Sequence, residues 1–125
     1  MTRWIVSGLL LVVGLLNLTP AILFFSPERS LSLYGIELTE TNLSIVMRHR
    51  AILLGLLGLA LIYAAFKTEF VIPAIIAALL GKAAFLFLVY SSNGANAEIN
   101  RIAMFDVGAI AFLIVALGMH LFAGK

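Results

Sequence analysis

The sequence predicts an all-α membrane protein: a four-helix bundle of spanning helices, with a short amphipathic helix between spans one and two. The first observation is composition, because the 125 residues are 63% hydrophobic and only 11% charged, with a mean hydropathy of +1.16. Soluble domains carry about 25% charged residues, so this chain could not cover a water-exposed surface with polar groups. The second is that four apolar stretches reach the roughly 20 residues needed to cross a bilayer. A chain of this length is expected to form a single domain, 1–125.

The first span is expected at 4–25, where Trp4–Phe25 contains no charged residue. At about 1.5 Å per residue this stretch covers a hydrocarbon core of about 30 Å. A cleaved signal peptide is the alternative, since Arg3 precedes the apolar run. Signal-peptide cores are usually about 7 to 15 residues long and end at small residues. Here the polar segment 26–29 (SPER) follows, so we expect a retained span.

A short helix is expected over 27–34 in the connection that follows. Ser26 is suited to the N-cap and Pro27 to the first helical position, and Gly35 is suited to end the helix. Its apolar side chains would let the helix lie along the membrane surface. These are Leu31, Leu33 and Tyr34.

The remaining spans are expected at 43–66, 70–90 and 98–122. Thr39 is the expected N-cap of the second span and Asn96 that of the fourth. Only residues 67–69 separate spans two and three, so these two helices must form an antiparallel hairpin.

The two ends of the bundle differ little in positive charge. Both termini lie at one end with Arg3, Lys67 and Lys125; the other end has Arg29, Arg48, Arg50 and Arg101. The positive-inside rule slightly favours the second end in the cytoplasm. Three of its four arginines lie within helices, however, where they can serve a site. We therefore expect both termini in the cytoplasm of a bacterial inner membrane.

Lys82 interrupts an otherwise uncharged run near the middle of the third span. A lone lysine at this depth costs about 2.5 to 3.5 kcal/mol on insertion scales, so it should face the bundle interior and a partner. Lys82 precedes Tyr90 by eight residues and Asp106 follows Ile99 by seven, which places both charges about 10 to 12 Å below one membrane face. The sequence therefore predicts a Lys82–Asp106 ion pair. It can be a purely structural bridge, or it can also contact a ligand or a proton path.

Further ionisable side chains gather at the same end and predict a polar vestibule beneath the connecting helix. They are Arg48, His49 and Arg50 of span two, Tyr90 of span three, and Glu98 and Arg101 of span four. Glu98 and Arg101 are three residues apart and can pair. Consecutive helical residues are rotated by about 100°, so Arg48, His49 and Arg50 cannot all face one pocket. We expect Arg48 to point inward, Arg50 to contact lipid phosphate, and His49 to be either an interface residue or a ligand contact.

Small residues indicate which helix faces pack together, because membrane helices associate by close van der Waals contact. One stripe of the first span contains Ser7, Leu10, Gly14, Asn17 and Ala21. The second span has Arg48, Ala51, Gly55, Gly58 and Ile62, and the third has Ala74, Ala78, Gly81 and Phe85. Asn17 is expected to make a hydrogen bond between helices. Arg48 lies on the small-residue stripe, which is the basis for expecting it to point inward.

Several function classes are excluded by what the sequence lacks. There is no cysteine, and the net charge of +2 is too small for a nucleic-acid footprint. No glycine-rich phosphate loop is present, and one histidine with two scattered carboxylates makes a poor metal site. The sequence therefore predicts no cofactor, no metal and no nucleic-acid partner.

Leu33, Tyr34 and Gly35, the run 47–51 (MRHRA) with Gly55 and Gly58, and Asp106 with Val107 resemble a group of small bacterial integral membrane proteins. These proteins often carry the label "phosphopantetheine adenylyltransferase". The resemblance covers nearly the whole chain, and the Arg-His-Arg-Ala run is its most specific part. In architecture the chain is also similar to DoxX-type proteins. The labelled enzyme is a soluble nucleotidyltransferase with a His-x-x-His-type motif, whereas this chain has no such motif, so the resemblance implies a fold and not a reaction.

The expected function is binding of a small amphipathic or anionic ligand, such as a lipid headgroup, a quinone or an organic acid, in the vestibule. The candidate residues are Arg48, His49, Lys82, Asp106, Glu98, Arg101 and Tyr90. Arg48 would supply charge and paired donors, and His49 a proton acceptor near neutral pH. Two alternatives stay open: an accessory or assembly subunit of a membrane complex or a homodimer, and a small membrane enzyme that uses His49 with Asp106 or Glu98.

Overall fold

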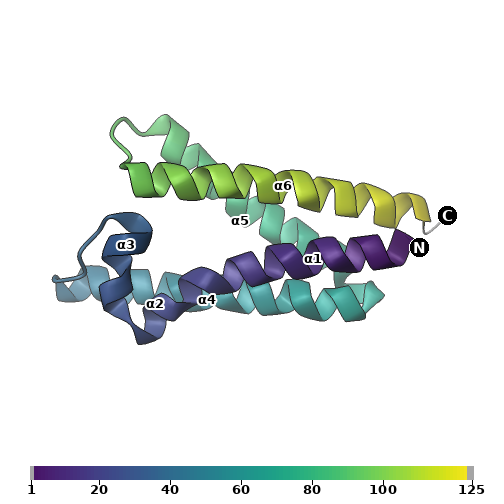
Figure 1. Ribbon diagram of the computed structural model, residues 1–125, viewed down its shortest axis with the longest axis horizontal. Helices are drawn as coiled ribbons and strands as arrows, with labels where there is room; N and C mark the ends of the chain where they lie inside the picture. The colour runs from purple at the N-terminus through teal and green to yellow at the C-terminus, as the bar shows by residue number, and fades with distance from the viewer. Residues whose placement is uncertain (1, 124–125) are drawn as a thin grey trace.

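A computed structural model describes residues 2–123 and confirms the all-α architecture (Figure 1). Among these residues there is no strand, and the helices are α1 (Thr2–Leu18), α2 (Ile22–Phe25), α3 (Ser30–Tyr34), α4 (Thr41–Phe66), α5 (Val71–Ser91) and α6 (Ala97–Ala123). Three short 3₁₀ turns connect them: η1 (Thr19–Ala21), η2 (Pro27–Arg29) and η3 (Thr68–Phe70). Four segments are long and apolar enough to cross a membrane: Thr2–Phe25, Thr41–Phe66, Thr68–Ser91 and Ala97–Phe122. Lys125, counted above with the termini, lies outside the described residues.

The first span lies at Thr2–Phe25, and η1 interrupts its α-helix between α1 and α2. Pro20 lies in this turn. Proline has no N–H group and cannot complete the α-helical hydrogen bond to the residue four positions earlier, so the helix tightens locally. The interruption lies at the end of α1 that is next to the connecting segment.

The connecting segment is not a single α-helix over 27–34 as expected. The 3₁₀ turn η2 replaces its first part, and the Ser26 side chain makes no capping hydrogen bond. Gly35 ends α3 as predicted, with a left-handed φ of +69°. Tyr34 is buried, and α3 packs against α6. Asn96 accounts for this: its Nδ2 donates to the Tyr34 carbonyl at 2.7 Å, while its Oδ1 caps α6 by accepting from Ile99 N at 2.8 Å.

Glu40, and not Thr39, caps α4. Its carboxylate accepts hydrogen bonds from the backbone N–H groups of Asn42 and Leu43, at 2.9 Å and 2.7 Å. An acidic residue at this position also interacts favourably with the positive end of the helix dipole. These two backbone hydrogen bonds lower the pKa of Glu40 below its ordinary value.

This lowered pKa predicts a small acid sensitivity of the fold. A carboxyl group whose pKa is depressed in the folded state stabilises the protein above its unfolded pKa of about 4.3, and the stabilisation is lost as pH falls through the folded pKa. Acidification from about pH 7 to about pH 3 should therefore lower the thermal unfolding temperature more in the wild type than in Glu40→Gln. Gln keeps one acceptor but cannot titrate. Equal acid-induced shifts in the two proteins would contradict this role of the cap.

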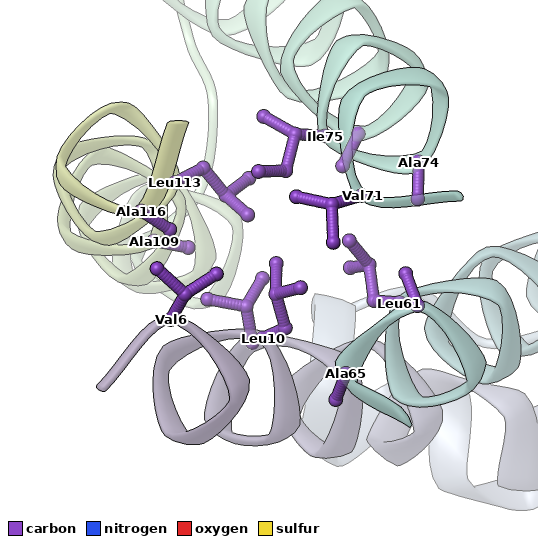
Figure 2. Close-up of a cluster of buried hydrophobic side chains, with 13 residues drawn as sticks. Val6, Leu10, Leu61, Ala65, Val71, Ala74, Ile75, Ala109, Leu113 and Ala116 are labelled. Atoms are coloured by element: carbon purple, nitrogen blue, oxygen red, sulfur yellow. The ribbon is translucent and has the colours of Figure 1, made fainter. Parts of the chain in front are cut away.

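The four long helices form two pairs, α1 with α4 and α5 with α6. The pairs converge at the end that holds both termini and diverge toward the opposite end, which holds α3 and the loop between α5 and α6 and is called the loop end below (Figure 1). Both termini lie at the convergent end. The apolar core fills that end, where side chains of all four helices point toward one another (Figure 2). Leu10, Leu61, Ile75 and Leu113 are fully buried there. The loop end is left more open, and α3 extends across it.

Glycines hold α1 and α4 in backbone contact, as the small-residue stripes predict. A Cβ atom added to Gly58 would lie 2.6 Å from the Gly14 carbonyl oxygen, and one added to Gly14 would lie 2.8 Å from the Gly58 carbonyl oxygen. Gly55 meets Ala21 in the same seam. Ser7 adds a hydrogen bond from its hydroxyl to the Ala65 carbonyl at 2.6 Å. The backbones of α1 and α4 are therefore packed directly against each other, and this pair forms one side of the open end.

Candidate functional site

Lys82 forms the predicted ion pair with Asp106. The ammonium lies 2.9 Å from Oδ1 of Asp106, and the two side chains are 8% and 18% exposed. It is the only ion pair among residues 2–123. Lys82 on α5 and Asp106 on α6 thus join the two helices of one pair at depth within the bundle. Because the charges are removed from water, each depends on the other for compensation.

Asn17 completes this polar group from the opposite helix pair. Its Oδ1 accepts a hydrogen bond from Lys82 Nζ at 2.8 Å, which links α1 to α5. This confirms the expected interhelical hydrogen bond of Asn17 and adds a third member to the pair. Two of the three N–H donors of Lys82 are therefore in use. We call Asn17, Lys82 and Asp106 the polar triad.

A cavity of about 500 Å³ opens between the diverging helix pairs, and all three residues of the polar triad line it. Its walls are mainly apolar and include Leu54, Leu57, Phe85, Leu88 and Phe105. Tyr34 of α3, Arg50 of α4 and Arg101 of α6 line the outer end, nearer the loops. Volumes of about 300 to 1,000 Å³ with apolar walls and a few polar groups are typical of small-molecule sites. This cavity takes the place of the predicted vestibule.

Arg50, and not Arg48, lines the cavity. Its guanidinium donates to the Tyr34 hydroxyl at 2.8 Å and lies 5.3 Å from the Tyr34 ring centroid and 5.4 Å from that of Phe85. Cation–π contact with two rings favours this position for an arginine in an apolar wall. Arg50 is therefore a cavity residue, and its expected contact with lipid phosphate stays a prediction.

Arg48 does not line the cavity and instead binds the end of α2. Its Nε and Nη2 donate to the Phe24 carbonyl at 2.9 Å and 2.6 Å. Carbonyl groups in the last turn of a helix lack intrahelical partners, and Arg48 supplies one. The small-residue stripe that contains Arg48 does point inward, but α1 and α2 fill that side of α4. Arg48 therefore points inward as expected, but toward α2 and not into the cavity.

The other candidates divide between cavity and surface. Arg101 lines the cavity and donates to the Ser32 carbonyl at 3.1 Å, so the expected Glu98–Arg101 pair does not form. His49 and Tyr90 are exposed. Glu98 lies beside Gly35. None of these last three lines the cavity, so the structure does not bring His49 together with Asp106 in one site.

Four polar residues that line the cavity were not among the sequence candidates: Asn17, Thr19, Tyr34 and Arg50. The spacing of Arg50, Leu54 and Leu57 could have shown that Arg50 lies on the same helix face as two apolar residues, since positions i, i+4 and i+7 share one face. Tyr34 could not be placed, because its burial depends on the docking of α3 against α6. Charge in the cavity is asymmetric: Arg50, Lys82 and Arg101 face a single carboxylate, Asp106.

Comparison of the chain with protein-family models, curated proteins and solved structures finds no match.

Proposed function

We propose that this multi-pass membrane protein binds a small amphipathic anion in the cavity between its two helix pairs. The observation that carries the proposal is the combination of apolar walls with three cationic side chains and one carboxylate in a single cavity. An excess of positive charge in a low-dielectric site favours an anion, and apolar walls favour a hydrocarbon body. Lipid-like molecules and organic acids combine these two properties.

Arg50 and Arg101 are the proposed contacts of the anionic group. Each guanidinium has five N–H donors, and each makes a hydrogen bond to one protein acceptor, the Tyr34 hydroxyl or the Ser32 carbonyl. The remaining donors are available to a carboxylate or phosphate. Lys82 is less suited to this role, because the triad already uses two of its donors. The apolar body would then lie against Phe85, Phe105 and the leucines of α4.

We also propose that the termini face the cytoplasm of a bacterial inner membrane. Both termini lie at the convergent end (Figure 1). The cavity extends toward the opposite end, where Tyr34, Arg50 and Arg101 line it. The arginines that unbalance the positive-inside count are Arg48, Arg50 and Arg101, and each has a structural partner or lines the cavity. Their positions are therefore explained by these structural roles and need not indicate which end of the bundle faces the cytoplasm. In this orientation the cavity faces the side opposite the cytoplasm.

The enzyme alternative has less support. It requires His49 near Asp106 or Glu98, and only Asp106 of these three lines the cavity. The accessory-subunit alternative needs no ligand in the cavity, so a direct binding measurement separates it from the proposed function.

The test is saturable binding of tritiated dodecanoate to the protein in nanodiscs. Dodecanoate combines a carboxylate with an apolar chain. Arg50→Gln and Arg101→Gln should each weaken binding about tenfold or more, because a hydrogen bond to a charged group contributes about 1.5 to 3 kcal/mol. Gln at position 50 can still bond the Tyr34 hydroxyl, so the change mainly removes charge.

Arg48→Gln is the matched control, since it removes the same charge from the same helix outside the cavity. It should lower thermal stability slightly and leave dodecanoate affinity unchanged. Absence of saturable binding in the wild type, or equal losses in Arg48→Gln and Arg50→Gln, would refute the proposed function.

A further inference from the structure

A second, smaller pocket lies at the convergent end of the bundle, where the termini meet the turn between α4 and α5 (Figure 1). It has a volume of about 190 Å³ and shares no residue with the cavity described above. Its walls come from α1, α4, η3, α5 and α6. The polar side chains that line it are those of Thr2, Arg3, Ser7, Thr68 and His120.

Most of these polar groups are available to a bound molecule. Arg3 is exposed and donates one hydrogen bond, from Nη2 to the Phe66 carbonyl at 3.4 Å, which leaves four of its five N–H donors. The hydroxyls of Thr2 and Thr68 and the ring of His120 make no hydrogen bond to the described part of the chain. No carboxylate among residues 2–123 lines the pocket. The pocket therefore presents a positive charge and further donors to one small volume.

The size of the pocket suits a compact anionic group. Sites that hold a whole small molecule usually measure about 300 to 1,000 Å³, and this pocket is smaller. A guanidinium can donate to two oxygens of a phosphate at once, and hydroxyl and imidazole donors can bind the remaining oxygens. The lining residues thus match a phosphate group.

The neighbouring aromatic residues place the pocket at the level of the lipid headgroups. Trp4 follows Arg3 and is 79% exposed, and Tyr63 precedes the pocket residue Ala64 and is 54% exposed. Trp and Tyr are enriched at membrane–water interfaces, where their rings lie among the headgroups. The second span also ends here, at Phe66. Lipid phosphates therefore lie at the depth of Arg3.

We propose that this pocket binds a phosphate group, with Arg3 as its charged contact and Thr68 and His120 as further donors. The site is separate from the cavity and does not depend on the proposed function. A phospholipid would place its headgroup phosphate in the pocket and keep its acyl chains in the bilayer. A soluble phosphate would enter the same pocket from the water.

The experiment is native mass spectrometry of the detergent-solubilised protein titrated with dioleoylphosphatidylglycerol. The wild type should bind this lipid saturably, and it should bind dioleoylglycerol, which has the same chains but no phosphate, about tenfold more weakly. Arg3→Gln should weaken binding of the phospholipid about fivefold, because it removes the charge-assisted hydrogen bonds. The isosteric variant Thr68→Val should weaken it about threefold, through loss of one neutral hydrogen bond.

Lys67→Gln is the matched control. Lys67 is exposed at the same end of the bundle and does not line the pocket, so this variant removes the same charge and should keep the lipid affinity. Equal losses in Arg3→Gln and Lys67→Gln would show attraction by surface charge alone and overturn the proposal. A loss in Arg50→Gln without one in Arg3→Gln would place the lipid in the cavity and also overturn it.

Inorganic phosphate distinguishes the two sources of the anion. Line broadening of its phosphorus NMR signal by the wild type, and not by Arg3→Gln, would show that soluble phosphate enters the pocket. Arg3-dependent binding of the phospholipid without such broadening would assign the pocket to the headgroup alone. The absence of Arg3-dependent binding of either probe would overturn the proposal. Dodecanoate affinity should be unchanged in Arg3→Gln, so the outcome here is independent of the outcome for the cavity.

Discussion

Lys82→Met is expected to destabilise the folded protein by about 3 kcal/mol, because it leaves the Asp106 carboxylate without its partner. The same change removes the donor to Asn17 Oδ1, so two buried acceptors lose their hydrogen bond at once. The cost is placed at the lower end of the range for buried pairs because Asp106 is 18% exposed. A denaturant-dependent unfolding experiment in mixed micelles measures it.

The double variant Lys82→Met, Asp106→Leu is the informative control. Removing both charges removes the uncompensated carboxylate, so the double variant should recover most of the lost stability. If the single variant is as stable as the wild type, the pair is not buried as described. Binding of dodecanoate to the double variant then separates the two roles of the pair: retained binding indicates a structural bridge, and lost binding indicates a ligand contact.

Gly58→Leu is expected to destabilise the protein by a similar amount, about 3 kcal/mol, through the contact between α1 and α4. The new Cβ would lie 2.6 Å from the Gly14 carbonyl oxygen, which is backbone and cannot rotate away. The helices must separate, and the packing that holds membrane helices together is then lost along the seam. Thermal unfolding in detergent should show a large decrease in the midpoint. Gly58→Ala should have a smaller effect in the same direction.

Gly108→Leu is the matched control for this substitution. Gly108 lies on α6, and a Cβ added there meets no atom within 4 Å. Leucine also has a higher helix propensity than glycine, so this variant should be as stable as the wild type or slightly more stable. Equal unfolding midpoints for Gly58→Leu and Gly108→Leu would show that α1 and α4 are not in backbone contact.

The spans and the central ion pair were predictable from the sequence because each depends on distance along the chain. Helical rise converts residue number into membrane depth, so Lys82 and Asp106 could be placed at one level on antiparallel neighbours. The cost of an isolated charge in hydrocarbon then required them to meet. The glycine seam was predictable for a similar reason, since Gly14 and Gly58 mark faces where helices can approach closely.

Small capping features were only partly predictable. Asn96 and Gly35 act at the expected helix ends because amide side chains and left-handed glycines have strong local preferences. Glu40 displaced Thr39 as the cap of α4, since its longer carboxylate reaches two backbone N–H groups.

By itself the sequence determined how many helices cross the membrane, at what depth the buried charges lie, and which small residues bring helices together. Tertiary structure alone decided that Arg50 faces the cavity while Arg48 closes α2, that Tyr34 turns inward, and that Asn17 joins the triad. The physical reason is that these helices are apolar on nearly every side. A helix in lipid has no strong contrast between a wet and a dry face, so its rotation is set by the neighbours that pack against it.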